Sequence, residues 1–290
     1  MTIMTTGFIP CGAKMPIIAL FAGALFGGSA LVATSAYFIG VAAVVISGIM
    51  LKKFKAFAGE PAPFVMELPA YHAPSASNVL RSMWERGWSF IKRAGTIILL
   101  STIILWFLSN FGFADGGFGW VEDSDASLLA AVGSVIAVIF IPLGFGNWQA
   151  AVATITGLIA KEEVVSTMQV FYPGDLIANI AMAFTAASAY SFMVFNLLCA
   201  PCFAAMGAIK REMNNAKWTW AAIGYMCGFA YVASLIVYQL GGLFTGAVTF
   251  GVWTVVALAA LAAIIYLLVR KGYQGEESTR RLTSVAAAAK

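Results

Sequence analysis

Eight long apolar runs dominate this 290-residue sequence and leave it few possible folds. They lie at about residues 15–28, 29–51, 94–113, 127–143, 148–171, 177–209, 218–243 and 247–269. A helix of roughly 20 apolar residues crosses the hydrocarbon core of a bilayer. Helices satisfy their own backbone polar groups there without closing a barrel. The runs therefore predict an all-α protein, a polytopic transmembrane bundle of about eight helical segments.

The composition supports a membrane protein. Hydrophobic residues make up 61% of the chain, charged residues 10%, and the mean hydropathy is +0.88, unlike a soluble domain with a charged surface. The net charge of +4 is small and the basic residues gather between apolar runs, which argues against nucleic-acid binding. The four cysteines lie in or beside apolar runs, so we expect free thiols. The first residues lack the pattern of a cleavable signal peptide.

The distribution of charge predicts an orientation. Basic residues are in excess in residues 52–93, around Lys210 and in the tail after Arg270, whereas the loop of residues 115–125 is acidic. Because basic loops remain in the cytoplasm, we expect the three basic regions to be cytoplasmic and the acidic loop to lie outside. The number of spans then places both termini in the cytoplasm, whereas a re-entrant first segment would move only the amino terminus to the other side.

Residues 75–93, SASNVLRSMWERGWSFIKR, follow Pro74 and mix tryptophan with arginine and lysine. This pattern is typical of an amphipathic helix that lies on the cytoplasmic face of the membrane, although a plain amphipathic linker would look the same. No repeat or soluble domain interrupts the chain. We therefore expect one membrane domain over residues 1–290, with the remaining transmembrane helices over 94–270 and a cytoplasmic tail over 271–290.

Two Pro-Cys pairs place a thiol next to an expected helix break, at Cys11 and Cys202. Proline removes a backbone donor and frees a carbonyl one turn back, and broken helices often form ion sites in transporters. A packing kink with a small buried thiol is the alternative. Cys199 forms a CxxC pair with Cys202, but a single pair lacks the second pair of ligands of a closed zinc site. On one continuous helix, Ser188, Ser191, Phe195, Cys199 and Cys202 would share a face, with Asn196 nearby.

Lys161, Glu162 and Glu163 interrupt the apolar run TITGLIAKEEVVSTM. Ionisable residues are costly inside a membrane and usually face a cavity or one another. Lys161 is a possible partner for one glutamate, which leaves the other carboxylate to meet a cation. A helix end in the headgroup layer is the alternative.

Glu67 lies in the proline-punctuated segment PFVMELPAYHAP, together with the single histidine, His72, which is more typical of a surface residue than of a ligand. The sequence has no HExxH, GxSxG or P-loop pattern, so it lacks the groups that metalloproteases, serine hydrolases and P-loop NTPases need.

Four segments resemble, in order, the carboxyl-terminal half of the ferrous iron transport protein B family. They read FIPCGAKMPIIALF, PFVMELPAYHAPSASNVLRSMWERGWSFIKRAGTIIL, NWQAAVATITGLIAKEEVVSTM and SFMVFNLLCAPCFAAMGAIKRE, within roughly residues 7–240. The resemblance implies a permease for Fe(II) in the inner or plasma membrane of a prokaryotic cell. It also implies that residues 7–72 hold the start of a second Gate-type segment and its loop. The family's GTP-binding domain and first Gate region have no counterpart in this sequence.

The resemblance also implies site residues and partners. Cys11 and Cys202 match the family's Pro-Cys positions, Glu67 its PFVMELP element and Glu162 its Ala-Lys-Glu element, whereas Cys199 rests on the CxxC spacing alone. Fe(II) is then the transported ion, with no stably bound cofactor. GTP would act only through a separate amino-terminal GTPase and Gate half, so the chain itself is expected not to be an enzyme. A homo-oligomer is the other expected assembly.

Two other functions remain compatible with the residues. The first is a non-transporting membrane scaffold or assembly subunit from a split or truncated gene. The second is a Gate-type transporter of another solute, such as a nucleoside.

Overall fold

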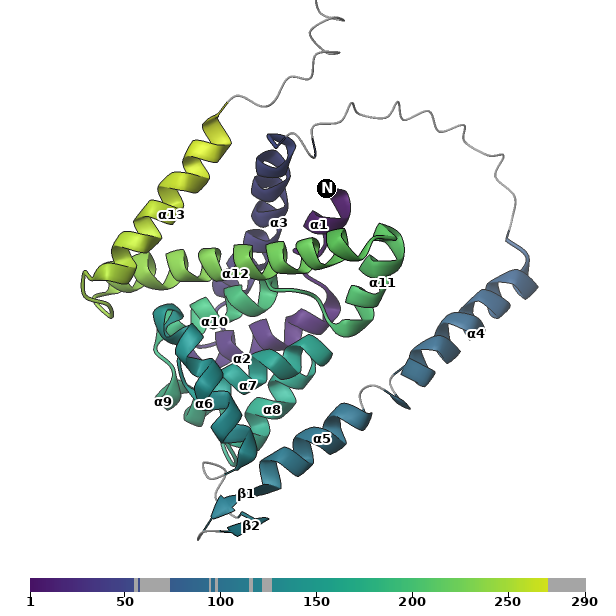
Figure 1. The fold of residues 1–290 in the computed structure, drawn as a ribbon, viewed down its shortest axis with the longest axis horizontal. Helices are drawn as coiled ribbons and strands as arrows, with labels where there is room; N and C mark the ends of the chain where they lie inside the picture. Colours follow the sequence, from purple (N-terminus) through teal and green to yellow (C-terminus); the bar gives the residue numbers. More distant parts are fainter. Residues whose placement is uncertain are drawn as a thin grey trace, which may run out of the picture.

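Helices make up nearly all of the described chain (Figure 1). The computed structural model describes residues 1–54, 57, 74–93, 95–96, 99–114, 117–121 and 127–270. The amino-terminal elements are α1 (Thr2–Thr6), η1 (Gly12–Lys14), α2 (Met15–Phe26), α3 (Ala30–Lys52), α4 (Ala76–Arg93) and α5 (Leu99–Asn110). The hairpin β1 (Phe111–Ala114) and β2 (Gly117–Trp120) follows, with Phe111 opposite Trp120. The remaining elements are α6 (Leu128–Phe140), η4 (Ile141–Leu143), α7 (Trp148–Ile159), α8 (Glu163–Phe171), α9 (Leu176–Ala183), α10 (Ala186–Leu198), α11 (Phe203–Met213), α12 (Ala216–Thr245) and α13 (Val252–Val269).

The helical bundle expected from the sequence is confirmed, but several apolar runs are broken. The run at 148–171 divides into α7 and α8, and the run at 177–209 divides into α9, α10 and α11. Asp175 caps α9 by accepting hydrogen bonds from the Ile177 and Ala178 backbone N–H groups, and Thr185 caps α10. These side-chain caps begin new helices inside one hydrophobic stretch.

Four helices in the described part of the chain have the length and apolar composition to cross a membrane. They are α3, α12, α13 and the combined α10–α11 stretch of residues 186–213. The pair formed by residues 128–143 and 148–159 is bent by 98° and counts as a fifth if it is taken as one broken span. The chain is therefore a multi-pass membrane protein.

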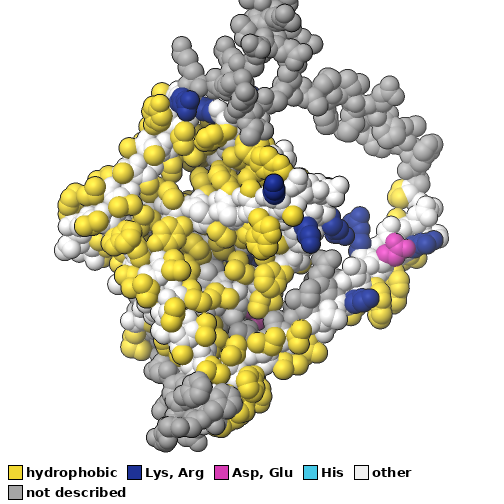
Figure 2. All heavy atoms as spheres, viewed as in Figure 1, with side chains coloured by type: hydrophobic (Ala, Val, Ile, Leu, Met, Phe, Trp, Pro, Cys, Tyr) yellow, Lys and Arg dark blue, Asp and Glu magenta, His cyan; other side chains and the backbone are white. Residues whose placement is uncertain are grey.

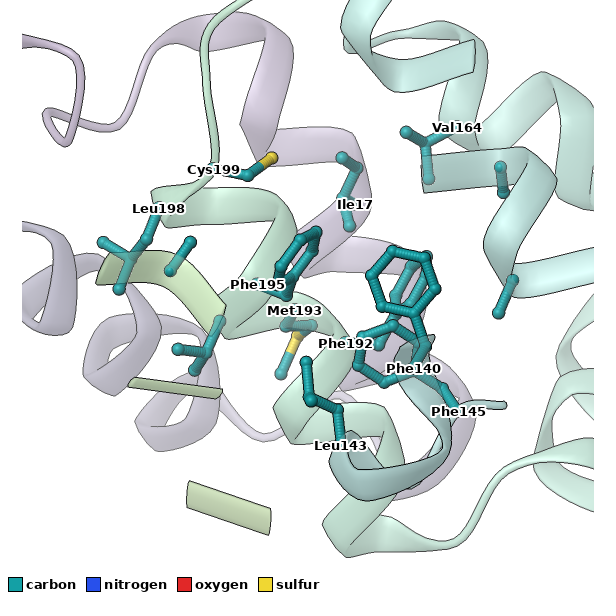
Figure 3. Packing of buried hydrophobic residues seen from close by; sticks show 14 of the residues in the cluster. Ile17, Phe140, Leu143, Phe145, Val164, Phe192, Met193, Phe195, Leu198 and Cys199 are labelled. Carbon is teal, nitrogen blue, oxygen red and sulfur yellow. The ribbon is translucent and has the colours of Figure 1, made fainter. Parts of the chain in front are cut away.

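Helix α10 lies at the centre of the bundle, packed against α2, α3 and α12. Its side chains from Ser191 to Leu198 are all buried. Aromatic rings fill the space beside it, with Phe140 and Phe195 at 5.3 Å and Phe145 and Phe192 at 5.2 Å between ring centroids (Figure 3). The core thus fixes the position of the α10 carboxyl end, which is where the CxxC pair begins.

Buried hydrogen bonds hold the bent α6–α7 pair against α12. Ser191 Oγ donates to the Leu143 carbonyl at 2.8 Å and lies 2.7 Å from Ser234 Oγ. Gln239 Nε2 donates to the Pro142 carbonyl at 2.8 Å. These bonds satisfy carbonyls that the helix break leaves without a helical partner.

Basic side chains lie at one end of the bundle. The Lys53 ammonium donates to the Leu268 carbonyl, so the carboxyl ends of α3 and α13 lie side by side. The hairpin β1–β2 lies at the opposite end of the molecule (Figure 1). Hydrophobic side chains cover most of the visible face, whereas lysine and arginine gather at its upper and right margins (Figure 2).

The helix expected over residues 75–93 is present as α4, which begins one residue later; its place on the membrane surface stays a prediction. It extends away from the packed helices (Figure 1), and all its described side chains are exposed. The acidic residues 115, 122, 123 and 125 and the tail 271–290 lie outside the described residues.

Candidate functional site

Three helix breaks supply the polar groups of the candidate site. The first contains Pro10 and Cys11, between α1 and η1. The second is the turn at residues 160–162, between α7 and α8. The third runs from Cys199 to Cys202, between α10 and α11. Both Pro-Cys pairs thus lie at breaks, as expected from the missing backbone donor of proline.

Packing brings the three breaks together. Helix α2 contacts both α8 and α10, and α11 contacts both α1 and α7. Lys14, which ends η1, interacts electrostatically with Lys161 of the second break and with the thiols of Cys11, Cys199 and Cys202. Figure 3 shows Cys199 at the end of α10, beside the pale purple α2 helix that carries Ile17. One centre therefore receives groups from three segments that are distant in sequence.

Two lysines are buried at this centre. The exposed fraction is 2% for Lys14 and 1% for Lys161. Lys14 Nζ donates to the Gly7 carbonyl at 3.0 Å, and Lys161 Nζ donates to Cys199 Sγ at 2.9 Å. Within the described residues the single salt bridge is Arg81–Glu85 on α4, so neither lysine pairs with a carboxylate there. Buried charges without an opposite charge are costly, so this centre suits a functional role better than a purely stabilising one.

Acceptor groups surround Lys161. Cys199 Sγ lies 3.6 Å from the Asn196 carbonyl, to which the thiol donates. The Asn196 side-chain oxygen Oδ1 is buried and has no hydrogen-bond partner among the described residues. A Cβ atom placed on Gly157 would lie 3.6 Å from that oxygen and 3.9 Å from Lys161 Cδ, which locates both beside α7. The thiol therefore accepts a hydrogen bond from the Lys161 ammonium, and the free amide oxygen lies on the same side of α7 as the Lys161 stem.

The break at Cys199–Cys202 falls near the middle of a span. Residues 186–213 together form a membrane-crossing stretch of 28 residues. Cys199 follows 13 of these residues, and at about 1.5 Å per residue this is roughly 20 Å from the start. The centre therefore lies in the middle third of this membrane-crossing stretch.

The structure corrects two expectations. Helix α10 ends at Leu198, so Cys199 and Cys202 lie in a break and do not extend the face of Ser188 and Ser191. Lys161 bonds to Cys199 and not to Glu162. Proline at position 201 explains the first difference, because it cannot continue the backbone hydrogen-bond ladder.

The proposed ligands do not form a compact metal-binding set. Cys11 and Glu162 are exposed, and Cys202 and Glu163 are half-buried. No group of three or more histidine, cysteine, aspartate or glutamate residues that could hold a metal occurs among the described residues. Glu67 and His72 lie outside those residues. The four cysteines are free.

The sequence did not identify two contributors, Lys14 and Cys227. Cys227 of α12 lies near the Ala200 backbone and interacts electrostatically with Cys199 and Lys161. Lys14 lies three residues after Cys11, at the start of an apolar run, where a lysine is usually a topology signal. The position of Lys14 three residues after Cys11 was the one sequence feature that could have assigned it to the site. Cys227 had none beyond its residue type.

Comparison with known proteins places this centre in a family context. Residues 33–86 match the family model described as "Ferrous iron transport protein B C terminus", and residues 91–216 match the model described as "Nucleoside recognition". The comparison with solved structures found no match.

Three relatives are named "Fe(2+) transporter FeoB". The protein from Staphylococcus aureus strain COL is 38% identical over 84% of this chain and 36% of its own length. The Methanocaldococcus jannaschii protein is 37% identical over 84% of this chain and 37% of its own length. The Salmonella typhimurium protein is 32% identical over 93% of this chain and 42% of its own length. The matched region thus spans little more than a third of these relatives, in their membrane part and not in a GTPase domain.

Proposed function

Because the chain belongs to the ferrous iron transport protein B family, as part of its carboxyl-terminal membrane region, we propose that it forms part of a membrane path for Fe(II). The observation that carries this proposal is the convergence of three helix breaks, two of which carry thiols, on one centre near the middle of a span. Breaks of this kind supply bare carbonyls and side chains to ions in transporters.

The proposed path uses Cys11, Cys199 and Cys202 at the centre, with Glu162 and Glu67 as carboxylate positions along it. Thiolates bind borderline and soft metals, and Fe(II) stands low in the affinity order of divalent ions. An open arrangement suits transport because an ion has to leave as readily as it enters. The separation of the three cysteines among two breaks fits a site of passage better than a storage site.

We propose further that the energy input comes from outside this region. A GTPase and a first Gate half, supplied by the rest of a longer protein or by a separate chain, would act on the path, and this chain would not itself be an enzyme. Association between copies is the other expected assembly. With the basic ends of α3 and α13 side by side, the proposed orientation places both in the cytoplasm.

Uptake of radioactive iron tests the proposal. The complete transporter, reconstituted in liposomes with GTP and Fe(II) under anaerobic conditions, is compared with Cys11→Ser and Cys202→Ser. Both variants are expected to lower the initial uptake rate at least about tenfold, a change of about 1.4 kcal/mol in barrier. Cys227→Ser is the matched control: it removes a thiol that lies beside the same centre but on the continuous helix α12 and not at a break, so it should have a smaller effect. Normal uptake by both break variants would refute the proposed path.

A nucleoside path is the second candidate, because residues 91–216 match the model described as "Nucleoside recognition". The same liposomes loaded with labelled uridine decide between the two. Uridine flux without Fe(II) flux supports the second candidate, and the absence of both favours a scaffold.

A further inference from the structure

We propose that the Lys161 ammonium group, in the ion-free state, occupies the position beside Cys199 that a divalent cation takes during passage. The ion would enter this position only after Lys161 has moved away. This inference rests on the proposed function, because it concerns the same centre and the same cargo.

The partners of Lys161 are those of a cation site. Its Nζ atom donates a hydrogen bond to Cys199 Sγ at 2.9 Å. The free Oδ1 of Asn196 and the Lys161 stem both lie within 4 Å of the position of a Cβ on Gly157, and the described residues offer this oxygen no donor. Sulfur and amide oxygen are also ligands that divalent metals accept. The ammonium thus lies where protein atoms already attract positive charge.

The charges at the centre support this exchange. Lys14 and Lys161 are both buried and lie close enough to repel each other. Because Lys14 stays in place, exchanging the Lys161 ammonium for one Fe(II) ion raises the charge of the centre by one unit, whereas adding the ion beside both ammonium groups would raise it by two. An ion added beside both ammonium groups would be repelled strongly at this depth.

Lys161 also has the means to move. It lies in the turn between α7 and α8 and not within a helix. Its charge stands on a flexible four-carbon stem. By contrast, Lys14 ends a helical turn and bonds to the Gly7 carbonyl, so it contributes charge without blocking the sulfur.

Binding of Co(II) to the complete transporter in lipid nanodiscs tests the inference without measuring transport. Co(II) replaces Fe(II) as an air-stable probe, and its thiolate charge-transfer absorption reports a cobalt–sulfur bond. Lys161→Met removes the charge and keeps the apolar stem, and it is expected to tighten Co(II) binding at least about tenfold and to increase the thiolate absorption. Adding Cys199→Ser should cancel this gain.

Lys14→Met is the matched control. It also removes a buried charge near the centre, so it should tighten binding, but its effect should be the same with and without Cys199. The double-mutant cycle therefore separates a blocking ammonium from general repulsion. If Lys161→Met leaves the affinity unchanged, or if its gain does not depend on Cys199, the inference is overturned.

Further outcomes are also decisive. Thiolate absorption in the wild type that requires Cys202, with no effect of Lys161→Met, refutes the inference but preserves the proposed path. Absence of thiolate absorption in the wild type and in both lysine variants refutes the ligand role of the thiols and the inference together.

If Lys161→Met and Lys161→Gln both fail to fold even with Co(II), Lys161 is a structural cation and the inference is wrong. If Co(II) restores their folding, the ion replaces the ammonium as proposed.

Discussion

The packed helices and the peripheral helix α4 use polar residues in opposite ways. At the breaks of the packed helices, the two lysines are buried and each donates to a particular atom, as Lys161 does to Cys199. On α4, polar groups share one face and point into solvent, and its ion pair Arg81–Glu85 joins two exposed side chains. The difference teaches that the breaks specify positions for individual groups, whereas α4 specifies only an amphipathic surface.

The largest expected effect contrasts two glycines. Gly144 has φ +86°, and a Cβ there would lie 2.0 Å from Tyr238 Cε2. Gly144→Ala should therefore lower the free energy of unfolding by about 3 kcal/mol, through left-handed strain and overpacking. Gly87 of α4 has no atom within 4 Å of such a Cβ, so Gly87→Ala should raise helix stability by about 0.5–1 kcal/mol. Thermal unfolding in detergent measures both, and equal effects would contradict the contrast.

The second prediction concerns the glutamates of the α7–α8 break. Glu162 is exposed before α8, whereas Glu163 lies in its first turn, where a negative charge is stabilised by the helix dipole. Glu162→Gln should lower Fe(II) uptake by the complete transporter about tenfold, and Glu163→Gln by less than about twofold. The amount of each variant in the membrane is the control. Normal uptake by both variants would assign the pair to helix stability alone.

The third prediction tests the surface of α4. Val79, Met83 and Trp84 lie on its apolar face and Ser82 on its polar face, and Trp84 and Trp88 stack at 6.1 Å between ring centroids. If α4 lies in the headgroup layer, Met83→Cys should react with a water-soluble maleimide several-fold more slowly than Ser82→Cys in nanodiscs. Mass spectrometry of the labelled peptide measures the rates. Equal rates would mean that α4 stands in water, since both positions are exposed in the structure.

The sequence predicted those parts of the fold that depend on local chemistry. Apolar length predicted a helical membrane bundle, and proline predicted the breaks at Cys11 and Cys202. The extra breaks before α9 and α10 also had local signals, since Asp175 and Thr185 are typical helix caps. Hydrophobicity alone does not reveal these two breaks, because a straight helix and a broken one can have equally apolar sequences.

The partners within the site were not predictable in this way. Lys161 and Cys199 are 38 residues apart, and their contact depends on how α2, α7 and α10 pack. The adjacent glutamates suggested an ion pair for Lys161, because they are its neighbours in the sequence. Residues i and i+1 do not face each other on a helix, so this proximity was misleading. Long-range packing replaced that pair with a thiol.

The central claim is that the breaks at Cys11 and Cys202 line one cation path. Protection of these thiols from alkylation tests the claim directly. The complete transporter in nanodiscs is treated with N-ethylmaleimide under anaerobic conditions at a range of Fe(II) concentrations. Ser89→Cys on the exposed helix α4 provides an unprotected reference thiol. One shared path predicts that Fe(II) protects Cys11 and Cys202 with the same half-saturating concentration and leaves the reference thiol unchanged. Protection of neither thiol, or protection of the two at clearly different concentrations, would contradict the account.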